Sequence, residues 1–368
     1  MRITKKELWL EMYKAAERVR DLQAWEWMEE DDIFAVVNPE NPEEIAFCSL
    51  MGSLGTFTAL AIYKGWEGYE SYLNLRNSGG IENKTYMINV GFMQSCWMVE
   101  FADASEIQKS SKDQLKELGI KYRGKGQWVD ISDRKPGLLP WFIQEKDVPF
   151  ITLCINQFFE IALRAEEDSS FLHQPNPNFN AVVEEDENED ELMGDEELLI
   201  FRKATAKADG KWVWFEEAVD VNSINYIEEI SQRITPSIAA ASLKKKLKQK
   251  ETCLMIGMMV IPAPIQEDEN EAPYLTIMIA YLLFGQQYVI KQELFKIDEI
   301  RPNFERLLLQ VLSELDYMPS QFLVNMDLVA EWLESYSELF EFEIFVDPED
   351  ENFEDFFEEF TQFLGNMP

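Results

Sequence analysis

The segment PYLTIMIAYLLFGQQYVIKQELFK, residues 273–296, decides the fold of the second half of the chain. It contains two long β-rich apolar runs, and the Gly-Gln-Gln sequence at 285–287 lies between them. A polar turn between two such runs is typical of a hairpin. Nowhere do the roughly 18 uninterrupted apolar residues of a membrane-spanning helix occur. The segment therefore predicts two adjacent antiparallel strands of a sheet.

The sequence around this hairpin alternates between strand and helix patterns. The predicted elements are a strand at 253–265, an amphipathic helix at 301–318, a strand at 320–325, a helix at 327–340 and a strand at 341–346. This alternation predicts an α/β domain with a mixed sheet. The order of hairpin, helix, strand, helix and strand is loosely like the ribonuclease-H and integrase topology. In the acidic tail, 349–368, phenylalanines recur at helical spacing, which predicts a helix that docks by one face.

The first half of the chain has a different pattern. Leu8, Met12 and Val19 recur at helical spacing, which predicts an amphipathic helix over residues 4–23. Turn sequences then separate three β-rich runs, which predict a three-stranded meander. Residues 146–166 are apolar on most faces and predict a buried helix. The amino-terminal domain is therefore expected to be α+β and to end near residue 168.

An acidic segment separates the two halves. Ten of the 14 residues from Glu184 to Glu197 are acids, and two Pro-Asn turns precede them. Like-charge repulsion and the lack of apolar residues predict a disordered linker. We therefore predict an α+β domain at 1–168, a linker at 169–197 and an α/β domain at 198–368.

The charge of the chain limits its partners. Asp and Glu total 69 against 33 Lys and Arg, which gives a net charge of −36. Nucleic acids and anionic membranes are bound through cations, so direct binding to either is not expected, whereas a basic protein partner is allowed. The start of the chain has no signal-peptide pattern, and the four cysteines are far apart with no CxxC motif. These features favour a soluble protein of the reducing cytoplasm.

Several segments resemble a group of uncharacterised two-domain proteins found in bacteria, mostly Gram-positive species. The resemblance rests on WLEMYKAAERV (9–19), WEWMEEDDIFAVVNPE (25–40), EIAFCSLMG (44–52), ALAIYKGWEGYESYL (59–73) and LGIKYRGKGQWVDISDRKPGLLPW (118–141). Residues 200–365 are similar, more weakly, to the second domain of the group. Both domains are of unknown function, so the resemblance implies a two-domain architecture and assigns no residue a role.

One candidate anion site lies in YRGKGQWVDISDRKPGLLPW, residues 122–141. Gly124 and Gly126 can expose backbone N–H groups as an anion-binding nest beside Arg123 and Lys125. A phosphate loop requires a strand before it and a helix after it, and here a strand pattern follows. The alternative, which we favour, is that the glycines only permit a turn. If the patch acts, its ligand is an acidic segment.

A candidate metal site rests on the fold analogy alone. Asp327 follows the strand FLVNM, and Glu331 or Glu334 lies on the next helix. A two-metal site also needs an acid on a neighbouring strand, and LTIMIAYLLFGQQ (275–287) has none. The simpler interpretation is that Asp327 caps the helix. The acidic runs at 184–197 and 347–359 lack the spacing of an EF-hand, so solvated charge explains them better.

The inventory of catalytic residue types is small. His173 is the only histidine, and it falls in the predicted linker. A zinc site or a catalytic triad would need partners that the isolated cysteines do not offer, so we expect a solvated histidine. We therefore expect no cofactor and a non-catalytic protein-interaction or regulatory protein. Two alternatives stay open: a carboxylate-dependent metal hydrolase or degenerate nuclease in the second domain, and an acidic mimic of nucleic acid.

Overall fold

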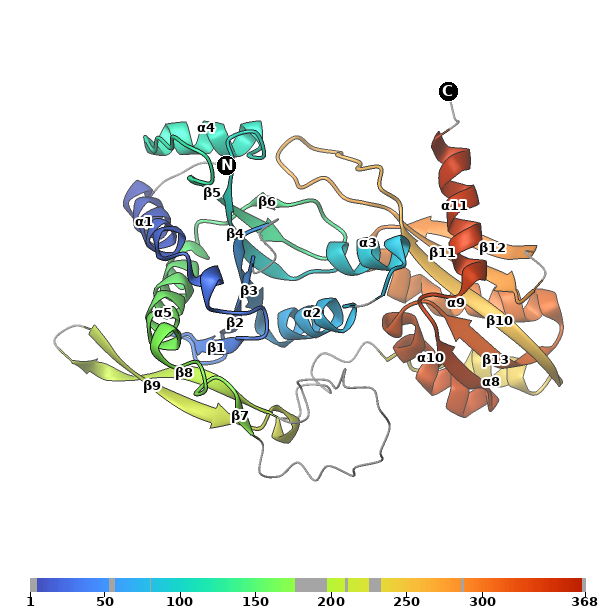
Figure 1. Ribbon diagram of the computed structural model, residues 1–368. Coiled ribbons are helices and arrows are strands. Elements are labelled where there is room, and N and C mark those ends of the chain that lie inside the picture. The colour runs from blue at the N-terminus through green and yellow to red at the C-terminus, as the bar shows by residue number, and fades with distance from the viewer. Residues whose placement is uncertain are drawn as a thin grey trace. The chain divides into compact units, whose positions relative to one another are not determined.

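The computed structural model describes residues 5–52, 57–79, 81–175, 197–208, 211–224, 233–285 and 288–365 (Figure 1). The chain forms two compact units, each with its own sheet. Unit 1 consists of Met1–Leu73, Ser95–Arg134 and Pro140–Tyr226. Unit 2 consists of Asn74–Gln94, Lys135–Leu139 and Ile227–Pro368.

Unit 1 is built on a nine-stranded sheet in the order β6-β5-β4-β3-β2-β1-β8-β7, with β9 paired to β8. The three predicted strands of the meander are β1, β2 and β3, which pair antiparallel in sequence order. The strands are β1 (Phe34–Val37), β2 (Ile45–Met51), β3 (Ala59–Lys64), β4 (Cys96–Ala102), β5 (Trp128–Arg134), β6 (Trp141–Phe142), β7 (Gln174–Pro175), β8 (Glu197–Ala208) and β9 (Lys211–Val219).

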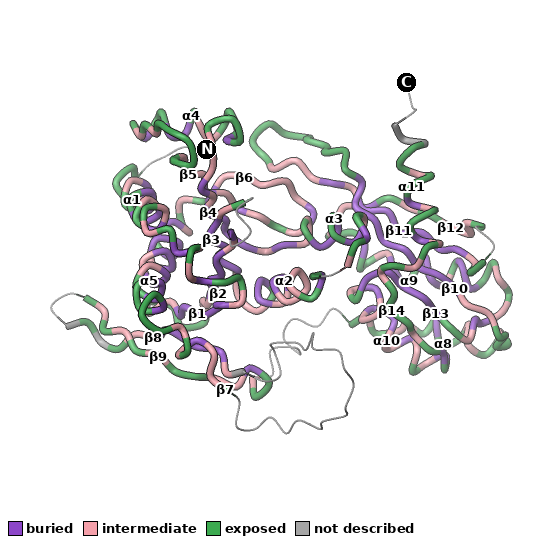
Figure 2. The backbone as a smooth tube through the Cα atoms, in the orientation of Figure 1, coloured by how far each residue is buried: buried purple, intermediate pink, exposed green. Residues whose placement is uncertain are grey.

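Helices cover both faces of this sheet. On one face, Trp9 of α1 (Lys6–Leu22) and Phe158 of α5 (Val148–Glu167) are buried in the main core. On the other face, aromatic rings of α2 (Gly65–Asn77) contact rings of β2, β3 and β8. A shorter helix, α4 (Lys109–Leu118), packs against α1. Figure 2 shows the central strands buried between these helices.

The predicted buried helix corresponds to α5, which starts with Pro149 in its first turn as helices favour. Among the described residues, α5 is the one helix long and apolar enough to cross a membrane. It is mostly buried inside the protein, and its residues Ile151, Ile155 and Phe158 are fully buried. Its position is that of a core helix.

Unit 2 is built on a five-stranded sheet in the order β12-β11-β10-β13-β14. β10, β11 and β12 are antiparallel, whereas β13 and β14 run parallel to β10. The mixed sheet and the predicted hairpin are thus present. The strands are β10 (Gln249–Val260), β11 (Ile277–Leu283), β12 (Tyr288–Phe295), β13 (Met318–Val324) and β14 (Glu343–Val346).

The two faces of this sheet are covered unequally. Residues of four helices join one core with the strands: α3 (Lys84–Phe92), α8 (Ile238–Lys244), α9 (Ile297–Leu315) and α10 (Asp327–Phe340). On the opposite face, α11 (Glu351–Gly365) packs alone against the sheet through Phe353 and Phe357. The predicted one-sided docking of the carboxy-terminal helix is therefore confirmed.

The unit boundaries differ from the predicted domains in two places. The hairpin of β8 and β9, which falls within the predicted second domain at 198–368, belongs to unit 1 because β8 pairs with β1. Conversely, residues 74–94 and 135–139 belong to unit 2. Gly137 there donates its N–H to Phe92 and accepts the N–H of Leu275. A Cβ at Gly137 would lie 2.8 Å from Ile297, so the close approach requires glycine.

The predicted linker falls largely outside the described residues, at 176–196. The first residues of the predicted linker, 169–175, are described and form a turn and then β7, which pairs with β8.

Asn89 ties α3 to unit 2, and its loss should destabilise that unit. Its amide donates to the Met258 carbonyl and accepts from the Val260 N–H, both at 2.8 Å, with the side chain fully buried. Asn89→Ala leaves buried backbone groups unpaired, so we expect it to lower the free energy of unfolding of unit 2 by about 1–3 kcal/mol. Urea unfolding of the full chain, followed by tryptophan fluorescence, measures this.

Asn303→Ala is the matched control, because Asn303 is only half-buried on α9 and its hydrogen bonds are exposed to solvent. Equal unfolding midpoints for Asn89→Ala and the wild-type chain would show that α3 does not dock on β10.

Candidate functional site

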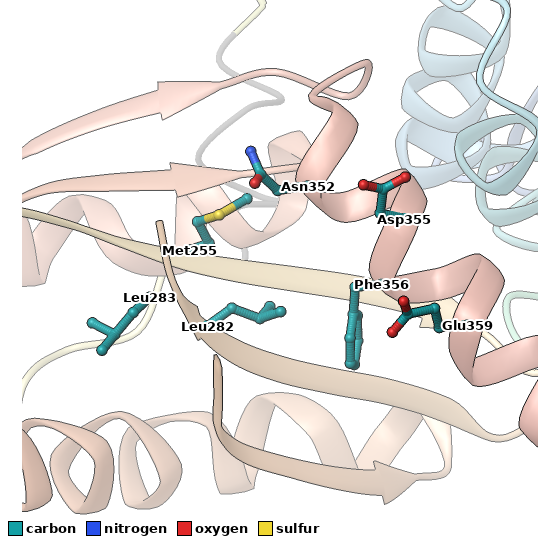
Figure 3. A pocket seen from close by; sticks show the side chains of 7 residues that line it. All are labelled: Met255, Leu282, Leu283, Asn352, Asp355, Phe356 and Glu359. Atoms are coloured by element: carbon teal, nitrogen blue, oxygen red, sulfur yellow. The ribbon is translucent and has the colours of Figure 1, made fainter. Parts of the chain in front are cut away.

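A cleft lies beside α11 on the sheet of unit 2 (Figure 3). Its volume, including the part open to solvent, is about 340 Å³. That is the lower end of the range for ligand pockets, which suits one or two side chains of a docked segment. The strands contribute Met255, Leu282 and Leu283, and the helix contributes Asn352, Asp355, Phe356 and Glu359.

α11 is positioned on the sheet by two phenylalanine rings that pack against a glycine of β10. Gly257 lies in the middle of β10, and a Cβ there would come within 2.9 Å of Phe357 and 3.0 Å of Phe353. The two rings therefore occupy the space that a side chain would fill. Both phenylalanines are 1% exposed, so the helix is held on the sheet by burial of its aromatic face.

The exposed side of α11 gives the cleft an acidic wall. Asp355 and Glu359 are one helical turn apart and both are exposed. In the described part of the chain, neither carboxylate has an ion-pair partner. The floor is apolar. It consists of Met255 and Leu282, which are 1–2% exposed, and of Phe356, which is half-buried. An apolar floor with a carboxylate rim suits a side chain with an aliphatic stem and a cationic end, such as Lys or Arg.

A second location of interest is the crevice at the carboxyl ends of β10 and β13. Open α/β sheets commonly bind ligands at such a point. Here the Asn325 side chain accepts the N–H of Met258 at 2.8 Å and donates to the Met258 carbonyl at 2.9 Å. Asn89 of α3 bonds to the same strand. The crevice is therefore filled by amide groups that satisfy the backbone.

The predicted metal ligands lie next to this crevice on α10. Met326 is the cap residue and Asp327 is the first residue of the helix, with no side-chain capping bond, so the predicted capping role was wrong. Asp327 is exposed, yet the neighbouring packed end of the sheet partly desolvates its carboxyl and raises its pKa above the ordinary value. Glu331 is one turn further along α10 and half-buried.

The strand neighbouring Asp327 supplies no third ligand. From Cys253 to Val260, β10 contains no acid. In the register of β10 with β13, Asp327 is level with the position eight residues after Glu251. At about 3.3 Å per residue, Glu251 is therefore roughly 26 Å away along the strand. Among the described residues, no group of three or more His, Cys, Asp or Glu side chains is close enough to hold a metal ion.

The predicted anion patch is an exposed loop before β5. Gly124 and Gly126 have φ angles of 105° and 65°, so both positions favour glycine, as the turn interpretation requires. The Gly126 N–H donates to the Asp103 carboxylate at 2.5 Å. Arg123 and Lys125 are exposed beside it. An external anion would have to displace Asp103, so binding of an anion by this loop stays a prediction.

His173 is placed differently from the expected solvated histidine. Its Nε2 lies 2.7 Å from Oδ1 of Asp32, and the Asp32 side chain is only 4% exposed. The other carboxylate oxygen of Asp32 accepts the N–H of Glu29 at 2.8 Å. The pair holds the turn before β7 in place within unit 1. Because His173 and Asp32 are far apart in the sequence, their contact could not be predicted from it.

The sequence analysis also missed an ionic cluster on β3, β4 and β5. Lys64 lies 2.5 Å from Asp133 and Arg134 lies 2.5 Å from Glu100. Asp130 pairs across the strands with Glu100. The strand sequence WVDISDR places charges among apolar residues, which was the available signal. Because opposite charges are joined in pairs, we interpret the cluster as structural.

Asp130 gives this cluster a testable pH dependence. Burial raises the pKa of Asp130 above its ordinary value of 3.8, and the Glu100 carboxylate raises it as well, whereas a hydrogen bond from Ser111 lowers it. A raised pKa in the folded state means that the group's contribution to stability is full below about pH 3.8 and is lost as the pH rises through the folded pKa. Asp130→Asn should therefore be more stable than the wild-type chain at pH 7, with the difference vanishing in acid.

Urea unfolding at several pH values measures this difference. Asp113→Asn is the control, because Asp113 is exposed on α4 and should change stability by less than about 0.5 kcal/mol. A less stable Asp130→Asn variant at pH 7 would show that the ionised carboxylate is a net stabiliser.

Comparisons with known families are consistent with a two-domain protein. Residues 9–182 match a family model described as Domain of unknown function (DUF7309). Residues 240–361 match another, described as Domain of unknown function (DUF6930). No curated protein and no solved structure matches the chain. The two matches fall one in each half of the chain, and neither family has an assigned function.

Proposed function

We propose that the protein is a non-catalytic interaction protein that binds a basic amphipathic helix of a partner protein in the cleft beside α11. The observation that carries the proposal is the combination of an apolar floor, in which the half-buried Leu283 and Phe356 lie over buried strand residues, with an unpaired acidic wall, formed by Asp355 and Glu359. The apolar floor supplies burial energy and the acids select for Lys or Arg.

The dimensions of the sheet support a helix as the ligand. Five strands span about 19 Å between the outer strand axes, at about 4.8 Å per step. One helix with its side chains is about 10 Å wide, so α11 covers only part of this face. Leu294 on β12 and Phe345 on β14 are 53% and 47% exposed on the α11 face, where they pair with the buried residues Met278 and Leu323. The uncovered strip toward β12, next to the cleft, is narrower than a helix, so a docked helix would rest one face on it and extend over the β12 edge.

Charge supports a basic ligand and opposes an acidic one. The exposed residues of α11 include Glu351, Glu354 and Glu358 besides the acids of the cleft. In the described part of the chain, α11 has no basic residue. A second copy of α11 would therefore be repelled from the strip, whereas a Lys-rich helix would be attracted.

The topology of unit 2 supports a ribonuclease-H-like fold whose catalytic position is not used. The strand order β12-β11-β10-β13-β14, with the first three antiparallel and the last two parallel to β10, matches the strand arrangement expected of that fold. From Cys253 to Val260, β10 has no acid, and at the carboxyl ends of β10 and β13 the amides of Asn89 and Asn325 bond to the β10 backbone. This favours binding over a carboxylate-dependent hydrolase.

We also propose that the protein acts in a reducing compartment such as the cytoplasm. All four cysteines are free thiols, and Cys48, Cys96 and Cys154 are buried. Burial raises the pKa of Cys96 to about 12, so this thiol stays protonated and unreactive at neutral pH.

Binding of a model peptide tests the proposed cleft. The probe is a fluorescently labelled helix of about 18 residues with leucines on one face and lysines on the other. We expect the wild-type chain to bind it and Asp355→Lys/Glu359→Lys to weaken binding at least about tenfold, because two attractive charges become repulsive. Fluorescence anisotropy at a fixed salt concentration of about 0.15 M gives the dissociation constants.

Glu354→Lys/Glu358→Lys is the matched control. It makes the same change in net charge on the same helix, but on residues that do not line the cleft. The proposal requires this variant to bind the peptide within about threefold of the wild-type chain, allowing for long-range charge. Equal weakening by both double variants would show that the peptide recognises net charge alone, and the proposed site would be wrong.

A further inference from the structure

β9 is an edge strand that carries exposed apolar residues. It pairs with β8 in regular register from Leu199↔Val219 to Thr205↔Val213. Among the described residues, no strand pairs with its other edge. Figure 1 shows β9 along the outer side of the hairpin. Proteins commonly protect such edges with proline or bulges. β9 contains no proline, and the one register shift of the hairpin adds its extra residue to β8, between Thr205 and Ala208. The open backbone groups of β9 are therefore available to another strand.

The residues of β9 alternate between two faces. Trp214 and Glu216 share one face, where Trp214 packs on the main core and Glu216 bonds to Arg202. Val213 and Phe215 lie on the opposite face and are 48% and 42% exposed. Lys211 and Glu217 stand on the same face as these two and are also exposed. The exposed face thus reads Lys, Val, Phe, Glu along the strand.

We propose that two copies of the chain associate by antiparallel pairing of their β9 strands about a two-fold axis at Trp214. In this register Lys211 lies opposite Glu217 of the second copy, and Val213 lies opposite Phe215 of the second copy. The symmetry repeats each pair, so the interface has two charge pairs and two apolar pairs. The two nine-stranded sheets of unit 1 join into one continuous sheet.

The sequence of β9 singles out this register. A two-fold axis perpendicular to the sheet keeps each residue on its own face of the sheet. Directly opposed residues of two antiparallel strands also share a face. Each residue must therefore pair with one an even number of positions away in sequence, so the axis lies level with a residue and not between two residues. An axis at Val213 places Lys211 opposite Phe215, and an axis at Phe215 places Val213 opposite Glu217. Both arrangements oppose a charge to an apolar side chain. On the exposed face, only the axis at Trp214 matches charge with opposite charge and apolar residue with apolar residue; on the other face it brings Trp214 beside its own copy and Trp212 opposite Glu216.

A second copy is a better occupant of this edge than an unrelated strand. The order Lys, Val, Phe, Glu complements itself when reversed, and this is the pattern that an isologous interface requires. Glu217 is already 2.8 Å from Lys203 of its own chain, but its side chain is 49% exposed, so its carboxylate can accept a second cation. These charges limit repulsion at the contact, which matters because two chains of charge −36 repel each other at long range.

Charge reversal at the two ends of β9 tests the register. Lys211→Glu brings two glutamates together in each charge pair, and Glu217→Lys brings two lysines together, so each variant alone should weaken the dimer at least about tenfold. In an equimolar mixture the two variants can form a heterodimer, in which both charge pairs join a glutamate to a lysine and no like charges are opposed. We therefore expect the mixture to dimerise more tightly than either variant alone. Sedimentation velocity over a range of concentrations at about 0.15 M salt measures the three cases.

Two further variants separate the apolar contact from a general surface effect. Phe215→Lys should abolish the dimer, because it places a cation opposite Val213. Ile238→Lys is the control, because Ile238 is 87% exposed on α8, which belongs to unit 2 and not to the unit that contains β9, and it should leave the dimer unchanged. Circular dichroism establishes that each variant is folded.

The proposal is overturned by any of three results. The wild-type chain remains monomeric at every concentration tested, the dimer is insensitive to Phe215→Lys, or the mixture of Lys211→Glu and Glu217→Lys does no better than either variant alone. A strand from another protein on this edge would give the first result. Because the peptide cleft lies in unit 2, failure of the dimer does not affect the test of that cleft.

Discussion

The backbone of β10 places the main constraint on unit 2. β13 ends at Val324, so on that side the Met258 and Val260 backbone groups of β10 continue into a buried region without a partner strand, whereas β11 pairs with the other side. Leaving a buried N–H or carbonyl unpaired costs about 1–3 kcal/mol per group. The amides of Asn89 and Asn325 replace the missing strand, because each presents a donor and an acceptor as a backbone does. Unit 2 therefore needs a residue from the first quarter of the chain.

This solution has a consequence for function. The carboxyl ends of β10 and β13 are where a sheet of this topology offers ligands a crevice, and α3 closes it with Tyr86 and Val90 as well as Asn89. The remaining accessible apolar surface of the sheet is on the opposite face, where α11 covers the centre and leaves a strip at its side. That strip has an apolar floor and a carboxylate rim, and the proposed binding of a basic helix rests on this combination.

The parts of the fold that sequence could predict are those with a local period. The hairpin at 273–296, the helices α9 and α10, and the docking face of α11 all follow from the spacing of apolar residues. The errors concern partners. The pattern of β8 identifies a strand but not its neighbour, so its pairing with β1 could not be read. Asn89 is an isolated polar residue among the apolar residues of the second half of α3, and His173 is far in sequence from Asp32, so neither gives a periodic signal.

The excess of acids acts differently on the two exposed surfaces. Cations of the ionic cluster in unit 1 are used in pairs with acids, such as Lys64 with Asp133 and Arg134 with Glu100. At α11 exposed acids border an apolar strip, where they would attract basic segments and repel other copies of the chain. At β9 a lysine and a glutamate flank the apolar pair, so like copies can meet with little repulsion at the contact. If both proposals hold, one charge distribution opposes self-association at the proposed cleft and permits it at the edge of unit 1.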